Sequence, residues 1–360
     1  MELPLTIADF ERRAAEVLEP GPHGYYAGGA GDEITLRDNE RAWRRIAIRP
    51  RVMVDVSAPD TRTTLLGRER PHPIIVAPMA FQTLAHPEGE RAMARAAGER
   101  RAIFCLSSLA TTSAADAAAA APDATRWLQL YVFRDRAVSD ELVARAAERG
   151  YEALVLTVDL PVLGVRERDA LSGYVIDQAT AIPSLGGRRG GLAMTEVGEL
   201  IDPTLTWSDV ASFAERSGLP VLLKGVLTPE DARRAADHGA AGVVVSNHGG
   251  RQLDTVLSGA DALPAIADAV GDRLDVIVDG GVRRGTDVVK AMALGARAVM
   301  VGRPLLWGLA VSGEEGAGRV LEMLLAELDV ALALSGVPAA ASLDRDCVQA
   351  APWAGRMGQA

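Results

Sequence analysis

The chain has 360 residues and a formal net charge of −10, from 48 Asp and Glu against 38 Lys and Arg. Its basic residues are scattered rather than gathered in a stripe, which argues against nucleic acid or an anionic membrane surface as a partner. Cys105 and Cys347 form no CxxC or metal-type spacing, and no apolar run approaches the length that crosses a bilayer. We therefore expect a cytoplasmic protein with no targeting segment, no membrane span and no bound metal.

Residues 1–60 precede the first predicted strand. They contain an amphipathic helical pattern over 6–18, followed by the segment GYYAGGAGDEITLRDNERAW over 24–43. Because these residues do not fit the repeat that follows, we expect an N-terminal helical extension that forms a lid against one end of the main fold.

Short apolar runs bounded by turn residues recur eight times along the rest of the chain. They are nearly continuously apolar and rich in β-branched residues, as expected for parallel strands covered on both faces. The runs are 73–79, 102–108, 125–131, 153–159, 220–226, 242–247, 275–280 and 298–303. Helical patterns lie between them, at 87–100, 111–121, 136–150, 207–218, 228–239, 259–270 and 285–295. This alternation predicts an α/β fold, a (β/α)₈ TIM barrel in which residues 1–360 form a single domain.

Two further segments lie outside the repeat. The connection over 160–206, after the fourth predicted strand, is overlong and rich in Gly and charged residues. A long connection inside a compact domain is usually functional or mobile, so we expect an active-site loop there. The segment from about residue 313, with the pattern EEGAGRVLEMLLAELDVALALSG, predicts one more amphipathic helix.

Polar residues end most of the predicted strands. In a barrel of this type the chemistry lies at the carboxyl ends of the strands, so these positions are candidate site residues. They are Gln129, Tyr131, Thr157, Asp159, Lys224, Ser246, Asn247, His248, Asp279 and Arg303. The alternative for any one of them alone is a strand cap or a pair with a neighbour, but this does not readily explain all of them together.

The runs DGGVRRGTD (279–287) and VGRP (301–304) follow the last two strands, where barrels often bind phosphate with backbone N–H groups and a helix N-terminus. Glycine lets the backbone approach an anion, and Arg283 or Arg303 would add charge-assisted hydrogen bonds. The alternative is a pair of tight turns with solvated arginines. No GxGxxG follows the first strand, which argues against a nucleotide bound in the Rossmann manner.

Lys224 and His248 have more than one interpretation. A buried lysine at a strand end would form a Schiff base, stabilise negative charge on a cofactor ring, or pair with Asp or Glu. His248 has a possible orienting carboxylate in Asp159, the arrangement that makes an imidazole a competent base. No second His or Cys stands at ligand spacing, so a metal site is not expected.

Six segments of the chain form a recognisable set: APMAFQTLAHPEGE, QLYVFRDR, LTVD with the GVRERD that follows it, LLKGV, SNHGGRQLD and DGGVRRGTDV. In order and spacing they resemble the FMN-dependent L-2-hydroxy acid oxidases and dehydrogenases, the family of glycolate oxidase, lactate oxidase and mandelate dehydrogenase. The resemblance covers about residues 5–355, and its SNHGGRQLD motif is highly specific.

The resemblance implies that His248 is the active-site base, oriented and charge-stabilised by Asp159. The implied substrate-binding residues are Tyr25, Tyr131, Arg166, His248 and Arg251, with the two arginines on the substrate carboxylate and Tyr131 also counted as catalytic. An arginine pair suits this role because a planar guanidinium binds a planar carboxylate through two hydrogen bonds.

The resemblance also implies FMN as the cofactor, with Lys224 beside N1 and O2 of the flavin. Further implied flavin contacts are Pro78, Met79, Ala80, Ser107, Gln129, Thr157 and Ser246, and the implied phosphate contacts are Asp279, Gly281, Arg283, Gly302 and Arg303. The implied reaction is the oxidation of an L-2-hydroxy acid to the 2-oxo acid. The implied assembly is a homotetramer or octamer.

Two features bear on acceptor and substrate. Ala80 matches a position next to flavin N5 at which the family's oxidases carry alanine, which favours O₂ as the acceptor, giving H₂O₂, over a dehydrogenase that uses a quinone or other acceptor. Leu109 and Phe81 predict an apolar wall and a substrate side chain larger than hydrogen, and Met79 also departs from the plant glycolate oxidase. The alternatives are a flavin barrel acting on another type of substrate and an FMN-binding barrel without catalysis.

Overall fold

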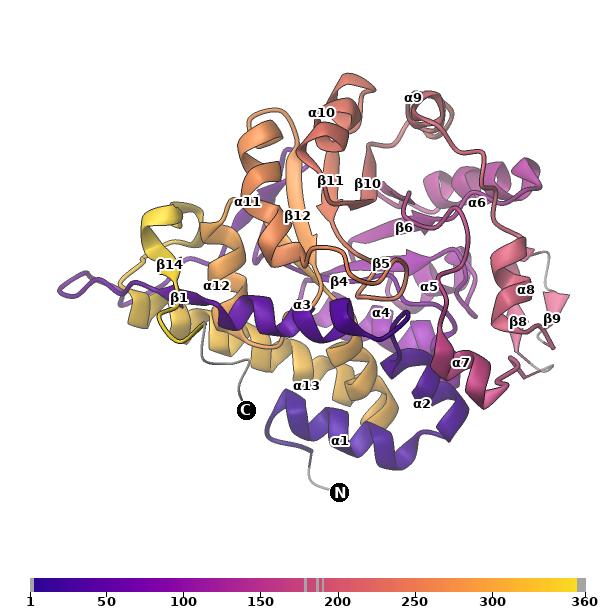
Figure 1. Cartoon of the computed structure of the whole chain (residues 1–360), viewed down its shortest axis with the longest axis horizontal. Coiled ribbons are helices and arrows are strands. Elements are labelled where there is room, and N and C mark those ends of the chain that lie inside the picture. Colours follow the sequence, from indigo (N-terminus) through magenta and orange to yellow (C-terminus); the bar gives the residue numbers. More distant parts are fainter. Residues whose placement is uncertain (1–2, 178–179, 186–187, 190, 355–360) are drawn as a thin grey trace.

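The computed structural model describes residues 3–177, 180–185, 188–189 and 191–354 (Figure 1). Within these residues, eight parallel strands close a barrel in the order β4, β5, β6, β7, β10, β11, β12 and β13. The strands are Ile74–Val76, Ile103–Ser107, Arg126–Leu130, Leu154–Thr157, Val221–Val226, Gly242–Val245, Asp275–Asp279 and Ala298–Val301. Each falls inside one of the predicted apolar runs, so the predicted barrel is confirmed.

Helices surround this barrel (Figure 1). They are α4 (Gly89–Glu99), α5 (Ala114–Ala120), α6 (Arg136–Glu148), α9 (Trp207–Ser217), α10 (Pro229–Asp237), α11 (Gly259–Val270), α12 (Gly285–Ala293) and α13 (Arg303–Ser335). The side chains of Ser113, Asp135, Thr228 and Ser258 accept hydrogen bonds from the first turns of α5, α6, α10 and α11. Such caps fix where each helix begins, because they satisfy N–H groups that have no partner within the helix.

The last helix differs from the prediction. It begins at Arg303, directly after β13, and contains a kink at Ser312 and Gly313, so the predicted tail helix is the second half of a longer element. Gly313 adopts a φ of +57°, which a glycine accepts without strain. Gly308 and Gly316 bring the two halves together, since a Cβ added at Gly308 would lie 2.4 Å from the Gly316 carbonyl oxygen.

The N-terminal extension contains α1 (Ile7–Val17), α2 (Pro20–Ala27) and α3 (Ile34–Arg44), followed by β1 (Ile46–Ile48). Helix α1 packs on α13. Helix α3 contacts the loops that follow β11 and β12, because Asn39 is bonded to Asn247 and the Trp43 indole donates to the Gly280 carbonyl at 2.9 Å. The extension therefore covers loops at the carboxyl end of the barrel, where the candidate site residues lie.

Other short elements complete the fold. The hairpin of β2 (Thr63–Leu65) and β3 (Arg68–Arg70) places the buried Leu65 against the residues that fill the barrel interior, and so closes the amino end. Strand β14 (Val348–Ala350) pairs antiparallel with β1. Short 3₁₀ turns are η1 (Gln82–Leu84), η3 (Ala340–Ser342) and η4 (Arg345–Cys347).

The long connection after β7 is not featureless. It contains α7 (Glu167–Ser172), β8 (Ala181–Ile182), η2 (Pro183–Leu185), β9 (Arg188–Arg189) and α8 (Met194–Glu199). Positions 178–179, 186–187 and 190 of the predicted 160–206 loop lie outside the described residues. None of the described helices combines the length and apolarity needed to span a bilayer.

Candidate functional site

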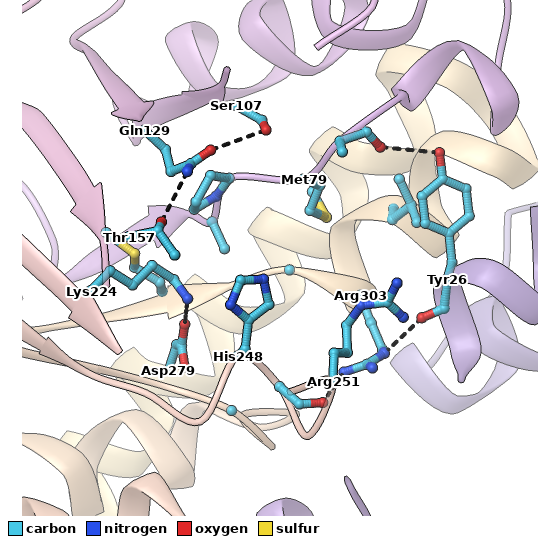
Figure 2. A pocket seen from close by; sticks show the side chains of 18 of the residues that line it. Tyr26, Met79, Ser107, Gln129, Thr157, Lys224, His248, Arg251, Asp279 and Arg303 are labelled. Atoms are coloured by element: carbon cyan, nitrogen blue, oxygen red, sulfur yellow. Dashed lines mark hydrogen bonds and ion pairs between the residues drawn. The ribbon is translucent and has the colours of Figure 1, made fainter. Parts of the chain in front are cut away.

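A pocket opens at the carboxyl ends of the barrel strands and encloses about 1180 Å³ of space, including its mouth (Figure 2). Most of the predicted site residues line it together. They are Tyr25, Pro78, Met79, Ala80, Ser107, Gln129, Tyr131, Thr157, Arg166, Lys224, His248, Arg251, Asp279, Gly281, Arg283, Gly302 and Arg303. Asp159 and Ser246 do not line the pocket and instead contact residues that do.

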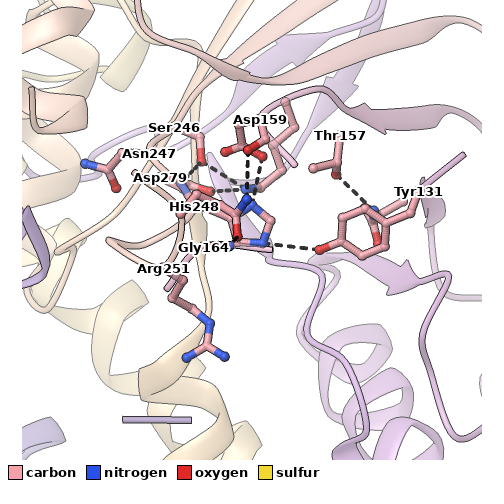
Figure 3. A network of polar contacts seen from close by, with 12 residues as sticks. Tyr131, Thr157, Asp159, Gly164, Ser246, Asn247, His248, Arg251 and Asp279 are labelled. Atoms are coloured by element: carbon pink, nitrogen blue, oxygen red, sulfur yellow. Dashed lines mark hydrogen bonds and ion pairs between the residues drawn. The ribbon is translucent and has the colours of Figure 1, made fainter. Parts of the chain in front are cut away.

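His248 stands between an acceptor and a donor (Figure 3). Its Nδ1 donates to Asp159 Oδ1 at 2.8 Å, which leaves Nε2 as the acceptor of the Tyr131 hydroxyl at 3.2 Å. Burial lowers the pKa of His248 below its usual value, although Asp159 acts to raise it. The imidazole is therefore neutral at neutral pH and has a nitrogen in the pocket that can accept a proton.

Asp159 is held in its charged form. Burial acts to raise its pKa, but the charge of His248, the hydrogen bond to it and the charge of Lys224 together lower that pKa below the usual range. A buried carboxylate in contact with Nδ1 fixes the tautomer and orientation of the imidazole. The predicted pairing of Asp159 with His248 is present in the structure.

Lys224 is a buried ammonium with two partners. Its Nζ lies 3.0 Å from Asp279 Oδ2 and donates to Ser246 Oγ at 2.9 Å. Burial acts to lower the pKa of Lys224, but Asp279 and then Asp159 raise it above its ordinary value. A Schiff-base lysine needs a depressed pKa, so this arrangement favours a lysine that supplies positive charge to the pocket.

Asp279 lies differently from the predicted phosphate contact. Its Oδ2 pairs with Lys224, and its Oδ1 is buried with no hydrogen-bond partner among the described residues. A carboxylate repels a phosphate dianion, so this oxygen suits a hydroxyl donor rather than a phosphate. Ser246 Oγ also accepts from the His248 N–H at 3.0 Å, so Ser246 links the lysine to the loop that carries His248.

Arg166 and Arg251 form a cationic corner beside Tyr25. Arg251 donates to the Tyr25 carbonyl at 2.5 Å and lies 4.8 Å over the Tyr25 ring, while Arg166 Nε donates to the Arg251 carbonyl at 3.1 Å. Burial, and then the charge of Arg251, lower the pKa of Arg166 to about 10. Two neighbouring cations repel, and Arg166 is buried, so an anion bound here would be stabilised.

A second cationic region lies where α12 and α13 begin. Arg303 donates to the carbonyls of Tyr26, Gly28 and Gly249 at 2.9 to 3.0 Å, and burial followed by the charges of Arg251 and Arg283 lowers its pKa to about 9. The Arg283 guanidinium contacts Glu40 at 2.8 Å. Its Nε is buried with no hydrogen-bond partner among the described residues.

Close backbone packing accompanies these arginines. Gly281 has a φ of +78°, and a Cβ there would lie 1.9 Å from the Asn39 carbonyl oxygen. Gly302 precedes the N-terminus of α13. Helix N-termini and partly buried arginines are suited to phosphate, so the residues present fit the phosphate of a mononucleotide.

Amide and hydroxyl side chains form a polar wall of the pocket. The Gln129 amide accepts from Ser107 Oγ at 3.1 Å and donates to Thr157 Oγ1 at 2.9 Å, which joins the ends of β5, β6 and β7 (Figure 2). Pro78, Met79 and Ala80 follow β4 and line the same pocket. This combination of apolar contacts and fixed amide and hydroxyl groups fits a flat heteroaromatic ring with polar edges.

The expected apolar wall is only partly present. Leu109 lines the pocket, but Phe81 does not. Phe81 has a left-handed φ of +57°, is fully buried and packs against Tyr25, with 6.0 Å between the ring centroids. The expectation for Phe81 was therefore wrong, because the backbone turn after Ala80 directs its side chain into the core.

Several site residues were not identified from the sequence. Leu160, Leu163, Val197, Gly198 and Ile201, all from the long connection, line the pocket. The Tyr26 hydroxyl donates to the Phe81 carbonyl at 2.6 Å. The buried Gln252 bonds the start of the long connection. Gln252 follows Arg251 within the SNHGGRQLD motif, which was the one signal that could have drawn attention to it.

Comparisons with known proteins agree with this geometry. The model of the FMN-dependent dehydrogenase family matches residues 14–350. L-lactate oxidase of a Nostoc species is 44% identical over 347 residues, which cover 92% of this chain and 94% of that protein. Glycolate oxidase of Spinacia oleracea is 44% identical over 363 residues, with 98% of each chain covered.

Solved structures give the same result. A crystal structure of mandelate oxidase matches with a TM-score of 0.90 at 40% identity, covering 96% of this chain and 98% of that one. These matches extend over the barrel, the N-terminal extension and the long connection. From the family model and the length of the matches, the chain belongs to the FMN-dependent dehydrogenase family and is an FMN-dependent enzyme of the 2-hydroxy acid oxidase type.

Proposed function

We propose that this enzyme oxidises an L-2-hydroxy acid to the 2-oxo acid, that FMN takes up the two electrons, and that O₂ reoxidises the flavin and is reduced to H₂O₂. The observation that carries the proposal is the neutral His248, bonded to Asp159, in one pocket with the neighbouring arginines Arg166 and Arg251. A barrel that only bound FMN would need neither a base nor a second anion site.

The chain's own residues bind the substrate and move its proton. Arg251 and Arg166 hold the carboxylate, with the Tyr25 side chain beside them. Tyr131 bonds the substrate hydroxyl and lies 3.2 Å from His248, which accepts a proton at Nε2. Asp159 stabilises the imidazolium that results.

FMN, when bound, supplies the two-electron acceptor for this reaction. The residues that would hold its ring are Pro78, Met79, Ala80, Ser107, Gln129, Thr157 and Lys224, with Ser246 supporting the lysine. Gly281, Arg283, Gly302 and Arg303 would hold its phosphate, and Asp279 would accept from a hydroxyl of the cofactor. The Lys224 ammonium would stabilise negative charge on the reduced ring.

The pocket favours a substrate with an apolar side chain larger than hydrogen. Leu109, Leu163, Val197 and Ile201 line it, and such a surface rewards burial of apolar area at about 25 cal/mol per Å². A second cavity adjoins the pocket across Leu160 and Ile201 and is lined by further apolar side chains, among them Leu205, Trp207 and Val210.

Anaerobic mixing of the oxidised enzyme with glycolate, lactate, 2-hydroxyoctanoate and mandelate tests both class and substrate. Loss of the yellow colour with one of these acids identifies the reaction, and kcat/KM is expected to be lowest for glycolate. Glycolate as the best substrate would contradict the assignment of the side-chain wall. No bleaching by any 2-hydroxy acid would contradict the proposed reaction itself.

The acceptor is tested separately. Ala80, beside the expected position of the flavin, places a methyl group where the family's oxidases carry one, and this supports O₂. Enzyme reduced by its substrate and mixed with air-saturated buffer is expected to regain its colour at least as fast as turnover, with one H₂O₂ formed per oxo acid. Reoxidation far slower than turnover with a quinone or dye would identify a dehydrogenase.

We also propose that residues 1–360 form a single domain, with residues 1–60 as a lid and 160–206 as the active-site loop. The protein would assemble as a homotetramer or octamer and act in the cytoplasm. The fully exposed Met53 and the exposed Val52 support assembly. They adjoin the exposed Leu334, because the Arg51 N–H donates to the Ser335 carbonyl at 2.9 Å. Light scattering on wild type and on Met53→Glu tests this, and a monomeric wild type would contradict it.

A further inference from the structure

The side chain of Gln252 is buried directly behind the substrate pocket, at 9% exposure, and all the hydrogen-bonding capacity of its amide is used. Its Nε2 donates to the carbonyls of Asp159 and Val162, each at 3.0 Å. Its Oε1 accepts from the Gly164 N–H at 3.2 Å and from Arg166 Nη2 at 3.3 Å. One amide thus bonds four residues of the connection that follows β7.

The chemistry of the partners fixes the orientation of the amide. Two of them are carbonyls, which can only accept, and two are an N–H and a guanidinium, which can only donate. The backbone must also approach closely here, because a Cβ added at Gly164 would lie 2.5 Å from the Gln252 carbonyl oxygen. The connection therefore wraps around Gln252 in one arrangement.

The two ends of this wrapped segment both serve the reaction. At one end, the Asp159 carboxylate bonds the Nδ1 of His248. At the other end, Arg166 also donates through Nε to the Arg251 carbonyl at 3.1 Å, so it is held from two sides. Gln252 itself does not line the pocket.

We propose that Gln252 is a positioning residue that sets the place of the Arg166 guanidinium relative to the His248 base, and so aligns the substrate carboxylate with the proton acceptor. The inference rests on the proposed function, in which Arg166 holds the substrate carboxylate. It adds a residue that acts through Arg166 without contacting substrate or cofactor.

The neutral charge of Gln252 matters as much as its shape. A carboxylate at this position would be a permanent counterion for Arg166 and would compete with the substrate carboxylate for it. It would also repel the carbonyl oxygens of Asp159 and Val162, because a carboxylate has no N–H group to donate to them. An amide orients the guanidinium while leaving its charge for the substrate.

Two substitutions test the hydrogen bonds and the neutral charge of the amide. Gln252→Met keeps the approximate volume and removes all four hydrogen bonds, whereas Gln252→Glu keeps an acceptor for Arg166 and adds charge. We expect both to retain FMN and to weaken substrate binding by about tenfold to 100-fold, the scale of a hydrogen bond to a charged group. KM should rise more than kcat falls. Binding of oxalate, followed by its perturbation of the flavin spectrum, reports carboxylate binding without turnover.

Tyr151→Phe is the matched control for a general loss of stability. It removes a buried hydrogen bond, from the Tyr151 hydroxyl to the Ala114 carbonyl at 3.1 Å, and neither residue lines the pocket. We expect it to lower the melting temperature and leave KM and the oxalate Kd unchanged. If Gln252→Met behaves like this control, with a lower melting temperature and an unchanged oxalate Kd, the inference is wrong.

A double-mutant cycle with Arg166→Met identifies the route of the effect. If Gln252 acts through Arg166, adding Gln252→Met to Arg166→Met should change the oxalate Kd by less than twofold. Full additivity would overturn the inference. An unchanged oxalate Kd in Arg166→Met alone would instead overturn the proposed role of Arg166, so the two failures are distinguishable.

Discussion

His248 shows at the scale of one residue how the fold prepares a base. Its backbone has a left-handed φ of +60°, an uncommon state for a residue other than glycine. Two hydrogen bonds hold that state, one that its N–H donates to Ser246 Oγ and one that its ring donates to Asp159. Strained backbone at a functional residue is stabilised by its surroundings, and here it aims Nε2 into the pocket.

His248→Ala is expected to retain FMN and to slow flavin reduction by about 10²- to 10⁴-fold, the usual contribution of a general base. Rapid anaerobic mixing with the best substrate measures the reduction rate, and the flavin absorbance of the purified protein reports cofactor content. The phosphate and ring contacts do not involve the imidazole, which is why FMN should remain. A reduction rate near that of wild type would refute the role of His248.

The lowered pKa of His248 predicts a pH dependence. Because the pKa lies below its usual value, the imidazole stays neutral down to below pH 6.5, and kcat/KM should be lost only as the pH falls through the depressed pKa. In Asp159→Asn the carboxylate no longer raises that pKa, so the midpoint of the acid limb should move to still lower pH while the maximal rate falls. A midpoint above 6.5 in wild type would contradict this.

At the scale of elements, the phosphate site depends on how closely α12 packs on α13. A Cβ added at Gly285, the first residue of α12, would lie 2.2 Å from backbone atoms of Glu327 and Leu328 in α13. The Gly285 N–H also donates to the Glu327 carboxylate at 2.9 Å. Gly285 therefore fixes the start of α12 just after Gly281 and Arg283, which contact the phosphate in the proposed function.

Gly285→Ala is expected to destabilise the protein by about 1–3 kcal/mol, the usual cost of overpacking, although alanine favours helices. Because the added methyl group would push α12 away from α13 and move the loop before α12, FMN should also bind more weakly. Thermal melting and FMN titration of the apoprotein measure the two effects. Gly24→Ala is the matched control, since a Cβ on this helical glycine would meet nothing within 4 Å. Equal melting temperatures for the two variants would contradict the expectation.

At the scale of the whole molecule, the cationic region of Arg283 and Arg303 would link folding to the binding of FMN. Burial lowers the pKa of Arg303 to about 9, so the folded chain carries this cation at a cost when no phosphate is near. A ligand that binds only the folded state raises stability in proportion to the logarithm of its concentration over Kd. FMN should therefore stabilise the whole barrel, although it contacts only one end.

FMN is expected to raise the melting temperature of the apoprotein more than riboflavin does, because riboflavin has the same ring but no phosphate. Arg283→Gln should reduce the effect of FMN and leave that of riboflavin unchanged, since Arg283 lines the pocket and holds the phosphate in the proposed function. Scanning fluorimetry at matched ligand concentrations measures this difference. Equal shifts for both ligands would show that the proposed phosphate site is not used.

The sequence by itself determined the barrel and much of the site. Apolar runs of strand length followed by capped helical patterns predict alternating strands and helices, because burial on both faces requires continuous apolar character. The polar residues that end those runs, such as Lys224 and His248, were identifiable because every parallel strand ends at the same rim. The SNHGGRQLD motif then indicated the family, which the comparisons confirmed.

The tertiary structure decided which partners those residues take. Asp279 faces Lys224, Phe81 turns into the core, and Gln252 bonds Arg166 and Asp159. These outcomes depend on two things that sequence patterns do not record. One is the local φ, which directs a side chain at a turn. The other is closure of the barrel, which brings together loops that are distant in the sequence, such as those of Asp159 and Gln252, 93 positions apart.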